Sequence, residues 1–252
     1  MRTVDIKARN GEFIKTFLYG QEKTKDTVIM CHGFSGDSSG IFNPALVEGL
    51  SNDYFVCRFD FRGSGQSQGE FSTTTITREL EDLDTVVKWI KKEYGQKRLI
   101  LIGHSFGAVI TTLYAAKNNV HRLILLAGEG DLEKAINLEF STTQQKELAT
   151  TGKTQVENWS RDGKKDYLNR GFLDDMRKYS TKDAMAKVTA PTLFIHGSKD
   201  DVIPPEASVE MCSLTKAKKE IVILDNVDHV FNFFTEQATL GKVIENIHKW
   251  VR

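Results

Sequence analysis

The stretch RLILIGHSFGAVITTLYAA, residues 98–116, joins an apolar run, a glycine-flanked turn and a helix-forming segment in direct succession. Residues 98–103 are typical of a buried strand, and the segment after Gly107 is typical of a helix. Gly103 and Gly107 flank Ser105 where the turn is too tight for larger side chains. Such a unit exposes the serine hydroxyl and directs the first amides of the helix toward it. The stretch therefore predicts that Ser105 is a nucleophile on an α/β fold.

The same Gly-x-Ser-x-Gly pattern occurs a second time at residues 65–69, around Ser67. The pattern alone is weak evidence for catalysis, so the structural context decides between the two serines. Ser67 follows a glycine-rich loop, with no strand leading into it and no helix leading out. We therefore interpret Ser67 as a loop serine.

Further apolar runs occur along the whole chain, and continuous runs of this length are typical of parallel strands buried on both faces. They lie at residues 27–31, 54–59, 122–127, 192–197 and 220–225. Helical patterns separate them, most clearly at 77–95, and two alternating runs around Asn10-Gly11 predict a hairpin over residues 4–18. The alternation predicts an α/β fold whose mostly parallel central sheet has about eight strands, with helices on both faces. Ligands should then bind beyond the carboxyl ends of the strands.

The segment 129–187 interrupts this alternation, because it contains short, charged, helix-like pieces and no convincing strand. A crossover between parallel strands needs only about a dozen residues, so most of the segment is surplus to the connection. We expect it to form a cap inserted into a single domain of residues 1–252. A disordered surface excursion is the alternative.

The composition favours a small neutral substrate. Lysine plus arginine and aspartate plus glutamate both number 34, so no net charge attracts nucleic acid or an anionic membrane. Cys31, Cys57 and Cys212 lack CxxC spacing and are typical of buried thiols in a reducing compartment. Without a signal-like N-terminus or an apolar run long enough to span a membrane, a cytoplasmic location is expected.

A serine nucleophile needs a base, which in this topology comes last in the chain, after the acid. His229 and His248 are the two histidines late enough to serve. His248 lies in the helical stretch GKVIENIHKW, whereas His229 follows the run at 220–225 and a short turn. We expect His229 to be the base.

The acid should follow the preceding strand, where Asp200 and Asp201 occur in a turn. Position alone does not separate these two neighbours. Asp225 and Asp228 are rivals close to His229, but turn formation accounts for both. Asp228 would also reach the imidazole of the next residue only with difficulty.

Acyl transfer also needs hydrogen-bond donors where the carbonyl oxygen becomes negative. Backbone amides can provide them. The amide of Phe106, directly after the nucleophile, should be one donor, and the loop His32-Gly33-Phe34 should supply the other, with Phe34 the better candidate.

No paired Cys/His spacing predicts a metal site, and no cofactor is expected. The remaining histidines are interpreted as structural or as neighbours of the site: His32, His104, His121 and His196.

Several motifs together resemble the α/β-hydrolase superfamily: CHGF (31–34), DFRGSGQS (60–67), GHSFG (103–107), HGSKD with DVIP (196–204), and DH (228–229). The resemblance spans nearly the whole chain outside residues 129–187 and is closest to carboxylesterases of the cinnamoyl and feruloyl type and to monoacylglycerol lipases. In that family HGxxD carries the acid, so the resemblance implies Asp200 rather than Asp201. It also implies Phe34 and Phe106 as the oxyanion amides. The loop is HGF rather than the HGGG of another esterase group, and the expected cap has no long apolar helix, which disfavours an interfacial lipase.

The resulting hypothesis is a serine carboxylic-ester hydrolase that acts through an acyl-enzyme on small to medium aryl or short-acyl esters. A monoacylglycerol lipase, a thioesterase and an aminopeptidase or amidase are alternatives, and a noncatalytic binding protein on this fold is a remote one. The oligomeric state, monomer or homodimer, is left open. The apolar cap residues expected to line a substrate pocket, or else to pack the cap on the core, are Leu138, Phe140, Trp159, Tyr167 and Phe172.

Overall fold

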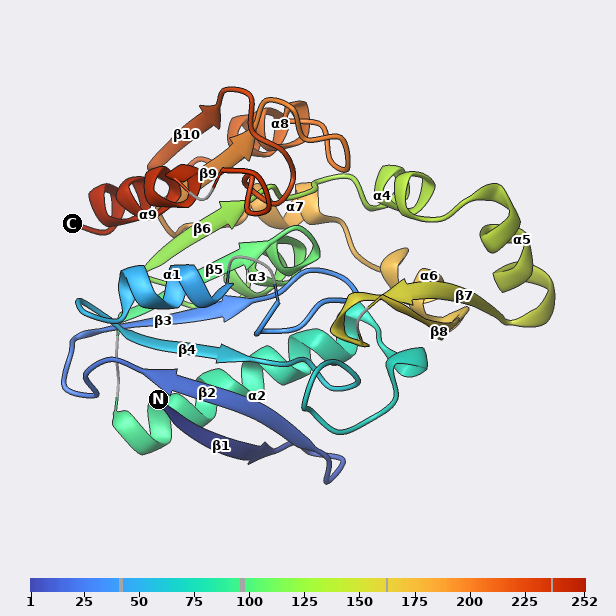
Figure 1. Ribbon diagram of the computed structural model, residues 1–252, viewed down its shortest axis with the longest axis horizontal. Helices are drawn as coiled ribbons and strands as arrows, with labels where there is room; N and C mark the ends of the chain where they lie inside the picture. The colour runs from blue at the N-terminus through green and yellow to red at the C-terminus, as the bar shows by residue number, and fades with distance from the viewer. Residues whose placement is uncertain (41–42, 96–97, 162, 237) are drawn as a thin grey trace.

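A computed structural model describes residues 1–252 except for residues 41–42, 96–97, 162 and 237. Within this described part, eight strands form the central sheet: β1 (Arg2–Lys7), β2 (Phe13–Tyr19), β3 (Asp26–Cys31), β4 (Phe55–Phe59), β5 (Arg98–His104), β6 (Arg122–Leu126), β9 (Thr192–Gly197) and β10 (Lys219–Leu224). Their order is β1-β2-β4-β3-β5-β6-β9-β10 (Figure 1). The strands from β4 to β10 are parallel, and β1 and β2 form the antiparallel hairpin predicted around Asn10-Gly11. The predicted fold class is confirmed.

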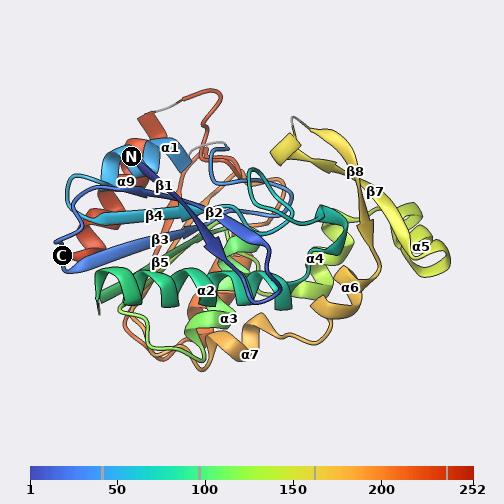
Figure 2. The same ribbon diagram turned by 90° about the horizontal axis from the view of Figure 1, so that it is seen from below.

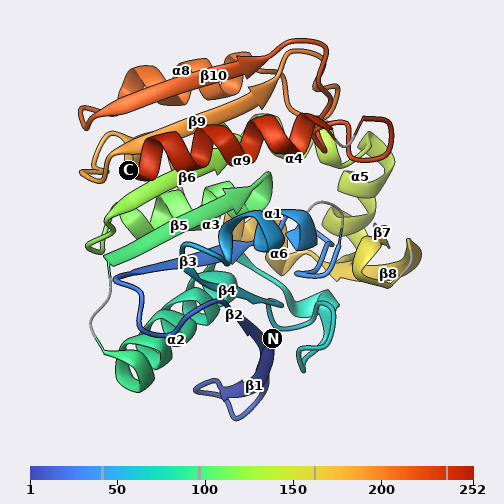
Figure 3. The same cartoon turned by 60° about the vertical axis from the view of Figure 1, so that its left-hand side comes forward.

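Helices cover both faces of the sheet, as Figures 2 and 3 show. The helices that pack on it are α1 (Asn43–Leu50), α2 (Ile76–Tyr94), α3 (Phe106–Ala115), α8 (Glu206–Leu214) and α9 (Ala238–Val251). Helices α1 and α9 bury their apolar side chains against one face, and α2, α3 and α8 against the other. No helix of the described residues has both the length and the apolarity of a membrane span.

The side chains of β3 explain why the central strands are continuous apolar runs in the sequence. Val28 and Met30 belong to the core beneath α1 and α9, whereas Ile29 and Cys31 belong to the core on the opposite face. Successive strand residues point to opposite faces, so a strand covered on both sides needs an apolar residue at every position.

Strand β10 departs from this rule. It lies at the edge of the sheet, and Ile223 stays half-exposed. The prediction that residues 220–225 are buried on both faces is therefore wrong, because an edge strand is covered only in part.

The segment 129–187, called the insertion below, lies between β6 and β9 at the carboxyl edge of the sheet (Figure 1). Its elements are α4 (Leu132–Glu139), α5 (Thr142–Thr151), β7 (Lys153–Asn158), the short 3-10 helix η2 (Trp159–Arg161), β8 (Lys164–Asn169), α6 (Gly171–Met176) and α7 (Thr181–Met185). Another 3-10 helix, η1 (Phe71–Thr73), precedes α2.

Strands β7 and β8 pair as an antiparallel hairpin, so the expectation of no strand in the insertion is wrong. Along β7 the buried residues Thr154, Val156 and Asn158 alternate with exposed charged or polar residues. Two of these three buried residues are polar, so the strand lacks the apolar run by which the others were recognised.

Candidate active site

Ser105 lies in the turn between β5 and α3, at the carboxyl edge of the sheet. Its φ of 54° and ψ of −120° are values that residues with a side chain rarely adopt. A Cβ at Gly107 would lie 2.3 Å from the carbonyl oxygen of Cys31, and one at Gly103 would lie 2.3 Å from that of Gly107. Only glycine fits at either position, and the Ser105 hydroxyl makes no bond that caps α3. The turn holds this hydroxyl at the wall of a cavity.

Asp200 and His229 come together from the loops that follow β9 and β10. Nδ1 of His229 lies 2.8 Å from Oδ2 of Asp200. The backbone amides of Val202 and Ile203 donate to Oδ1 of Asp200 at 3.0 and 2.8 Å. Burial raises the pKa of Asp200, but hydrogen bonds from two histidines outweigh burial and hold the pKa well below its usual range. Asp200 is therefore a carboxylate, and Nδ1–H of His229 donates to it.

The second histidine on Asp200 is His196, which the sequence indicated only as a structural neighbour. Its Nε2 lies 2.9 Å from Oδ2 of Asp200 and 2.9 Å from the carbonyl oxygen of Ile203. Its Nδ1 lies 2.7 Å from the hydroxyl of Ser208. Because both neighbours of Nε2 are acceptors, the proton is assigned to Nε2, and Nδ1 accepts from Ser208. His196 is fully buried and therefore helps to hold the carboxylate in place.

The loop of His229 runs beside the turn of Ser105. Nε2 of His104 lies 3.1 Å from the carbonyl oxygen of His229, and their ring centroids are 4.9 Å apart. Among the described residues no hydrogen bond joins the Ser105 hydroxyl to His229. Hydrogen bonds between a serine nucleophile and its base often shorten only when substrate binds, so His229 remains a candidate base for Ser105.

The rival acids and bases lie elsewhere or have other partners. Asp201 is exposed, and Asp225 and Asp228 accept hydrogen bonds from side chains and amides of adjacent loop residues. The ring of His248 stacks on that of Tyr54, with centroids 5.7 Å apart, between α9 and the end of α1.

Ser67 has a structural environment. Its hydroxyl donates to the carbonyl oxygen of Asp60 at 2.5 Å and accepts from the amide of Lys15 at 2.8 Å. These bonds tie the glycine-rich loop to β2, which agrees with the interpretation of Ser67 as a loop serine.

Phe34 and Phe106 are the residues expected to offer oxyanion amides. Phe34 lies in the loop after β3, and Phe106 is the first residue of α3. A Cβ at Gly33 would be 3.3 Å from the Cβ of Ser105, so the loop of Phe34 passes directly beside the serine. The two phenylalanine rings are 6.0 Å apart. Among the described residues no backbone carbonyl accepts a hydrogen bond from either amide.

Ser105 lines a narrow cavity of about 60 Å³ between the sheet edge and the insertion. Leu138, Phe140 and Phe172 line it too, as expected. Trp159 and Tyr167 do not line it, which corrects the expectation for these two aromatics: they are 65% and 44% exposed. Tyr167 points away from the buried face of β8 because strand side chains alternate, and its neighbour Leu168 takes the buried side.

Two carboxyl groups in this cavity, Glu129 and Glu139, were missed. Neither lies in a recognisable motif. The position of Glu129 two residues after the predicted strand 122–127 was the one available signal, since residues after parallel strands meet at the ligand-binding edge.

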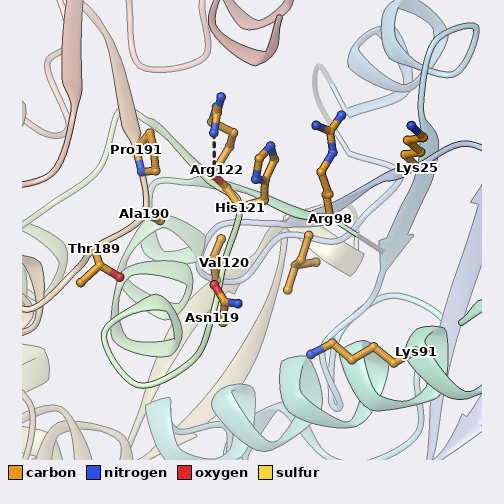
Figure 4. Close-up of a pocket in the computed structure, with 11 residues that line it drawn as sticks. Lys25, Lys91, Arg98, Asn119, Val120, His121, Arg122, Thr189, Ala190 and Pro191 are labelled. Atoms are coloured by element: carbon orange, nitrogen blue, oxygen red, sulfur yellow. Dashed lines mark hydrogen bonds between the residues drawn. The ribbon is translucent and has the colours of Figure 1, made fainter. Parts of the chain in front are cut away.

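A larger cavity of about 530 Å³ lies at the opposite, amino-terminal edge of the sheet (Figure 4). Its lining includes Arg98 and Arg122, the first residues of β5 and β6, together with Lys25, Lys91 and His121. Arg98 forms a two-point ion pair with Asp26, with both N–O distances 2.6 Å. The length of β5 separates this cavity from Ser105, so it plays no part in the candidate active site.

Comparison with known proteins places the chain among relatives that span nearly all of it. The chain is 27% identical over 240 residues to an uncharacterized protein, YfhR, of Escherichia coli O157:H7, with 92% of this chain and 74% of that protein covered. It is 25% identical to a monoglyceride lipase homolog of monkeypox virus, with 90% and 89% covered. The solved structure of Est1E from Butyrivibrio proteoclasticus with ferulic acid bound has 25% identity and a TM-score of 0.81, with 98% and 99% covered.

The family assignment follows from a match over more than half of the chain. The model of the alpha/beta hydrolase fold family matches residues 26–162, which run from β3 through the Ser105 turn into the insertion. This chain belongs to the alpha/beta hydrolase fold family.

Proposed function

We propose that this chain is a serine carboxylic-ester hydrolase in which Ser105, His229 and Asp200 act as nucleophile, base and acid. The observation that supports it most is the 2.8 Å bond between Nδ1 of His229 and Oδ2 of Asp200, at the same sheet edge as the strained Ser105 turn. That bond keeps the proton on Nδ1 and leaves Nε2 as the basic nitrogen. The esterase and lipase relatives favour the same chemistry.

In the first half-reaction, Nε2 of His229 takes the Ser105 proton while Oγ bonds to the ester carbonyl carbon. The carbonyl oxygen becomes an oxyanion, which the amides of Phe34 and Phe106 stabilise. Collapse of this intermediate breaks the bond to the alcohol oxygen, and the alcohol leaves with the proton held by His229. Water then attacks the acyl-enzyme by the same steps and releases the acid.

The size of the cavity favours binding of small esters over esters with long acyl chains, because the cavity is narrow and lined by aromatic side chains. Leu138, Phe140 and Phe172 reach it from the insertion. We propose that the insertion serves as a cap that shapes this cavity. Short-acyl and slender aryl esters fit best, in line with the ferulic acid bound to the related Est1E.

Steady-state hydrolysis of p-nitrophenyl esters from acetate to palmitate, and of methyl ferulate, tests the proposal. We expect wild-type enzyme to hydrolyse the shorter esters or the ferulate, and Ser105→Ala to lose that activity. A Ser67→Ala variant controls for the second Gly-x-Ser-x-Gly pattern. Equal activity in wild type and Ser105→Ala would refute the proposal.

A further inference from the structure

Glu129 is a buried carboxyl group in the same cavity as Ser105. It follows β6 at the carboxyl edge of the sheet and is 4% exposed. A charged side chain is almost never buried to this extent without partners. Glu129 therefore needs a physical reason for its place.

One of its two carboxyl oxygens, Oε1, has hydrogen-bond partners within the protein. Oε1 accepts hydrogen bonds from the backbone amides of Gly130 and Asp131, at 2.6 and 2.7 Å, where the chain leaves β6 for α4. These bonds fix the orientation of the carboxyl group. Burial raises the pKa of Glu129, and the two amides oppose that rise by favouring the charged form.

The other oxygen, Oε2, is buried and has no hydrogen-bond partner in the described part of the protein. Thr112, whose Oγ1 also lacks a partner, lines a second, small void, and Glu129 borders both this void and the cavity. A buried acceptor left unpaired is costly, and most buried polar groups in native proteins have a hydrogen-bond partner, in some cases a water, an ion or a ligand.

The charge of the cavity indicates which ligand group suits Oε2. Glu129 and Glu139 contribute two carboxyls, and the described lining contains no lysine, arginine or histidine. Apart from Ser105 the remaining side chains there are apolar. Such a lining disfavours a carboxylate or phosphate on the enclosed part of a substrate and favours a hydrogen-bond donor.

We propose that Oε2 of Glu129 accepts a hydrogen bond from a hydroxyl or ammonium group on the part of the ester that the cavity encloses. Glu129 is then a specificity-determining residue, and the preferred substrates are esters with a polar donor at the end of that part. This inference rests on the proposed function, because it assumes that Ser105 is the reacting group in the cavity.

Phenylboronic acids test the inference without assuming which half of the ester is enclosed. Boron accepts Oγ of Ser105 and the hydroxyl proton passes to His229, so the adduct is tetrahedral and reversible. We would measure inhibition constants for phenylboronic acid and for its meta and para hydroxymethyl, aminomethyl and carboxy derivatives, against p-nitrophenyl ester hydrolysis. For wild type we expect at least one hydroxymethyl or aminomethyl derivative to bind about tenfold more tightly than the parent, and the carboxy derivatives to bind more weakly.

Glu129→Gln is the matched variant. A glutamine keeps one oxygen for the amides of Gly130 and Asp131, but it replaces Oε2 with an NH₂ group that donates. The aminomethyl advantage should fall below about twofold, since an ammonium has only donors and would face that NH₂ group, whereas a hydroxyl can also accept and should lose less. Glu133→Gln removes the same charge from an exposed position on α4 and should leave the advantage unchanged.

The possible outcomes distinguish a failure of the proposed function from a failure of the role of Glu129. If phenylboronic acid fails to inhibit, or no ester is hydrolysed, the proposed function fails. If the parent inhibits and no hydroxymethyl or aminomethyl derivative binds better, or if Glu129→Gln keeps the aminomethyl advantage, the role of Glu129 is refuted. The wild-type series gives this answer even if Glu129→Gln does not fold.

Discussion

His196 and His229 approach the same oxygen of one carboxylate: Nε2 of His196 lies 2.9 Å, and Nδ1 of His229 2.8 Å, from Oδ2 of Asp200. The inner histidine is fully buried and held by Ser208, whereas the outer one lies beside the Ser105 turn. The contact with His196 therefore helps to fix the carboxylate, and the carboxylate in turn orients His229. This arrangement makes Asp200, and no neighbouring aspartate, the partner of His229.

Asp200→Asn should lower turnover by up to about 10,000-fold, because an amide cannot stabilise the charged imidazole and can favour the wrong tautomer. Asp201→Asn is the matched control, since Asp201 is adjacent and exposed and should leave turnover near that of wild type. Turnover numbers on the best p-nitrophenyl ester would decide. Equal damage in the two variants would contradict the assignment of the acid.

Alanine at two helical glycines should have opposite effects on the free energy of unfolding. In α3 a Cβ at Gly107 would lie 2.3 Å from a backbone oxygen, so Gly107→Ala should cost about 1–3 kcal/mol and distort the Ser105 turn. In α9 no atom lies within 4 Å of a Cβ at Gly241, so Gly241→Ala should gain about 0.5–1 kcal/mol. Urea denaturation measures both, and a stable, active Gly107→Ala enzyme would refute the account of the turn.

The buried pair of Arg62 and Asp82 should matter more than a surface pair on the same helix. The Arg62 and Asp82 side chains are 4% and 0% exposed, and the amide of Arg62 also donates to Asp82 at 2.8 Å. Asp82→Ala leaves this buried guanidinium with only its longer contacts to Glu12 and Glu81, at 3.5 and 3.4 Å, and should cost about 3 kcal/mol. Lys88→Ala breaks an exposed pair with Asp84 and should cost less than about 1 kcal/mol. Similar losses in the two variants would contradict this ranking.

Stability should fall with acidification in part because of His104. Burial, and then the charge of His229, lowers the pKa of His104 to about 3. In the unfolded chain the pKa of a histidine is about 6.5, so between these values the unfolded state binds a proton that the folded state does not. The free energy of unfolding should therefore decrease as the pH falls from about 6.5 toward 3, by at most about 1.4 kcal/mol per pH unit for this group.

His104→Gln removes this titration and should flatten the decrease. Urea denaturation of wild type and variant at several pH values between 7 and 4 measures the two slopes. An unchanged slope in His104→Gln would show that His104 does not contribute.

The fold could be predicted from sequence wherever a single structural requirement determined the residue types. Strands covered on both faces need apolar residues throughout, so the central strands could be recognised. The turn of Ser105 needs a glycine on each side, so it could be recognised too. Asp200 and Asp201 are equivalent in sequence, and only the family resemblance separated them. Their side chains differ in three dimensions, since Asp200 is buried against two histidines and Asp201 is exposed.

The parts that were missed depend on contacts distant in sequence. The β7–β8 hairpin has a polar alternating pattern, and its strands pack against α5 and η1 rather than within a two-sided sheet. Trp159 and Tyr167 looked like pocket residues because aromatics are usually buried, yet the hairpin turns them outward. Glu129 follows an ordinary strand, and its unpaired oxygen is evident only from the folded cavity.

The central claim is that Ser105 is the nucleophile, and mass spectrometry after treatment with a fluorophosphonate tests it most directly. Wild-type protein should gain the mass of one probe, the modified peptide should carry it on Ser105, and Ser105→Ala should stay unlabelled. Label on Ser67, label retained by Ser105→Ala, or a wild-type protein that does not react would contradict the claim.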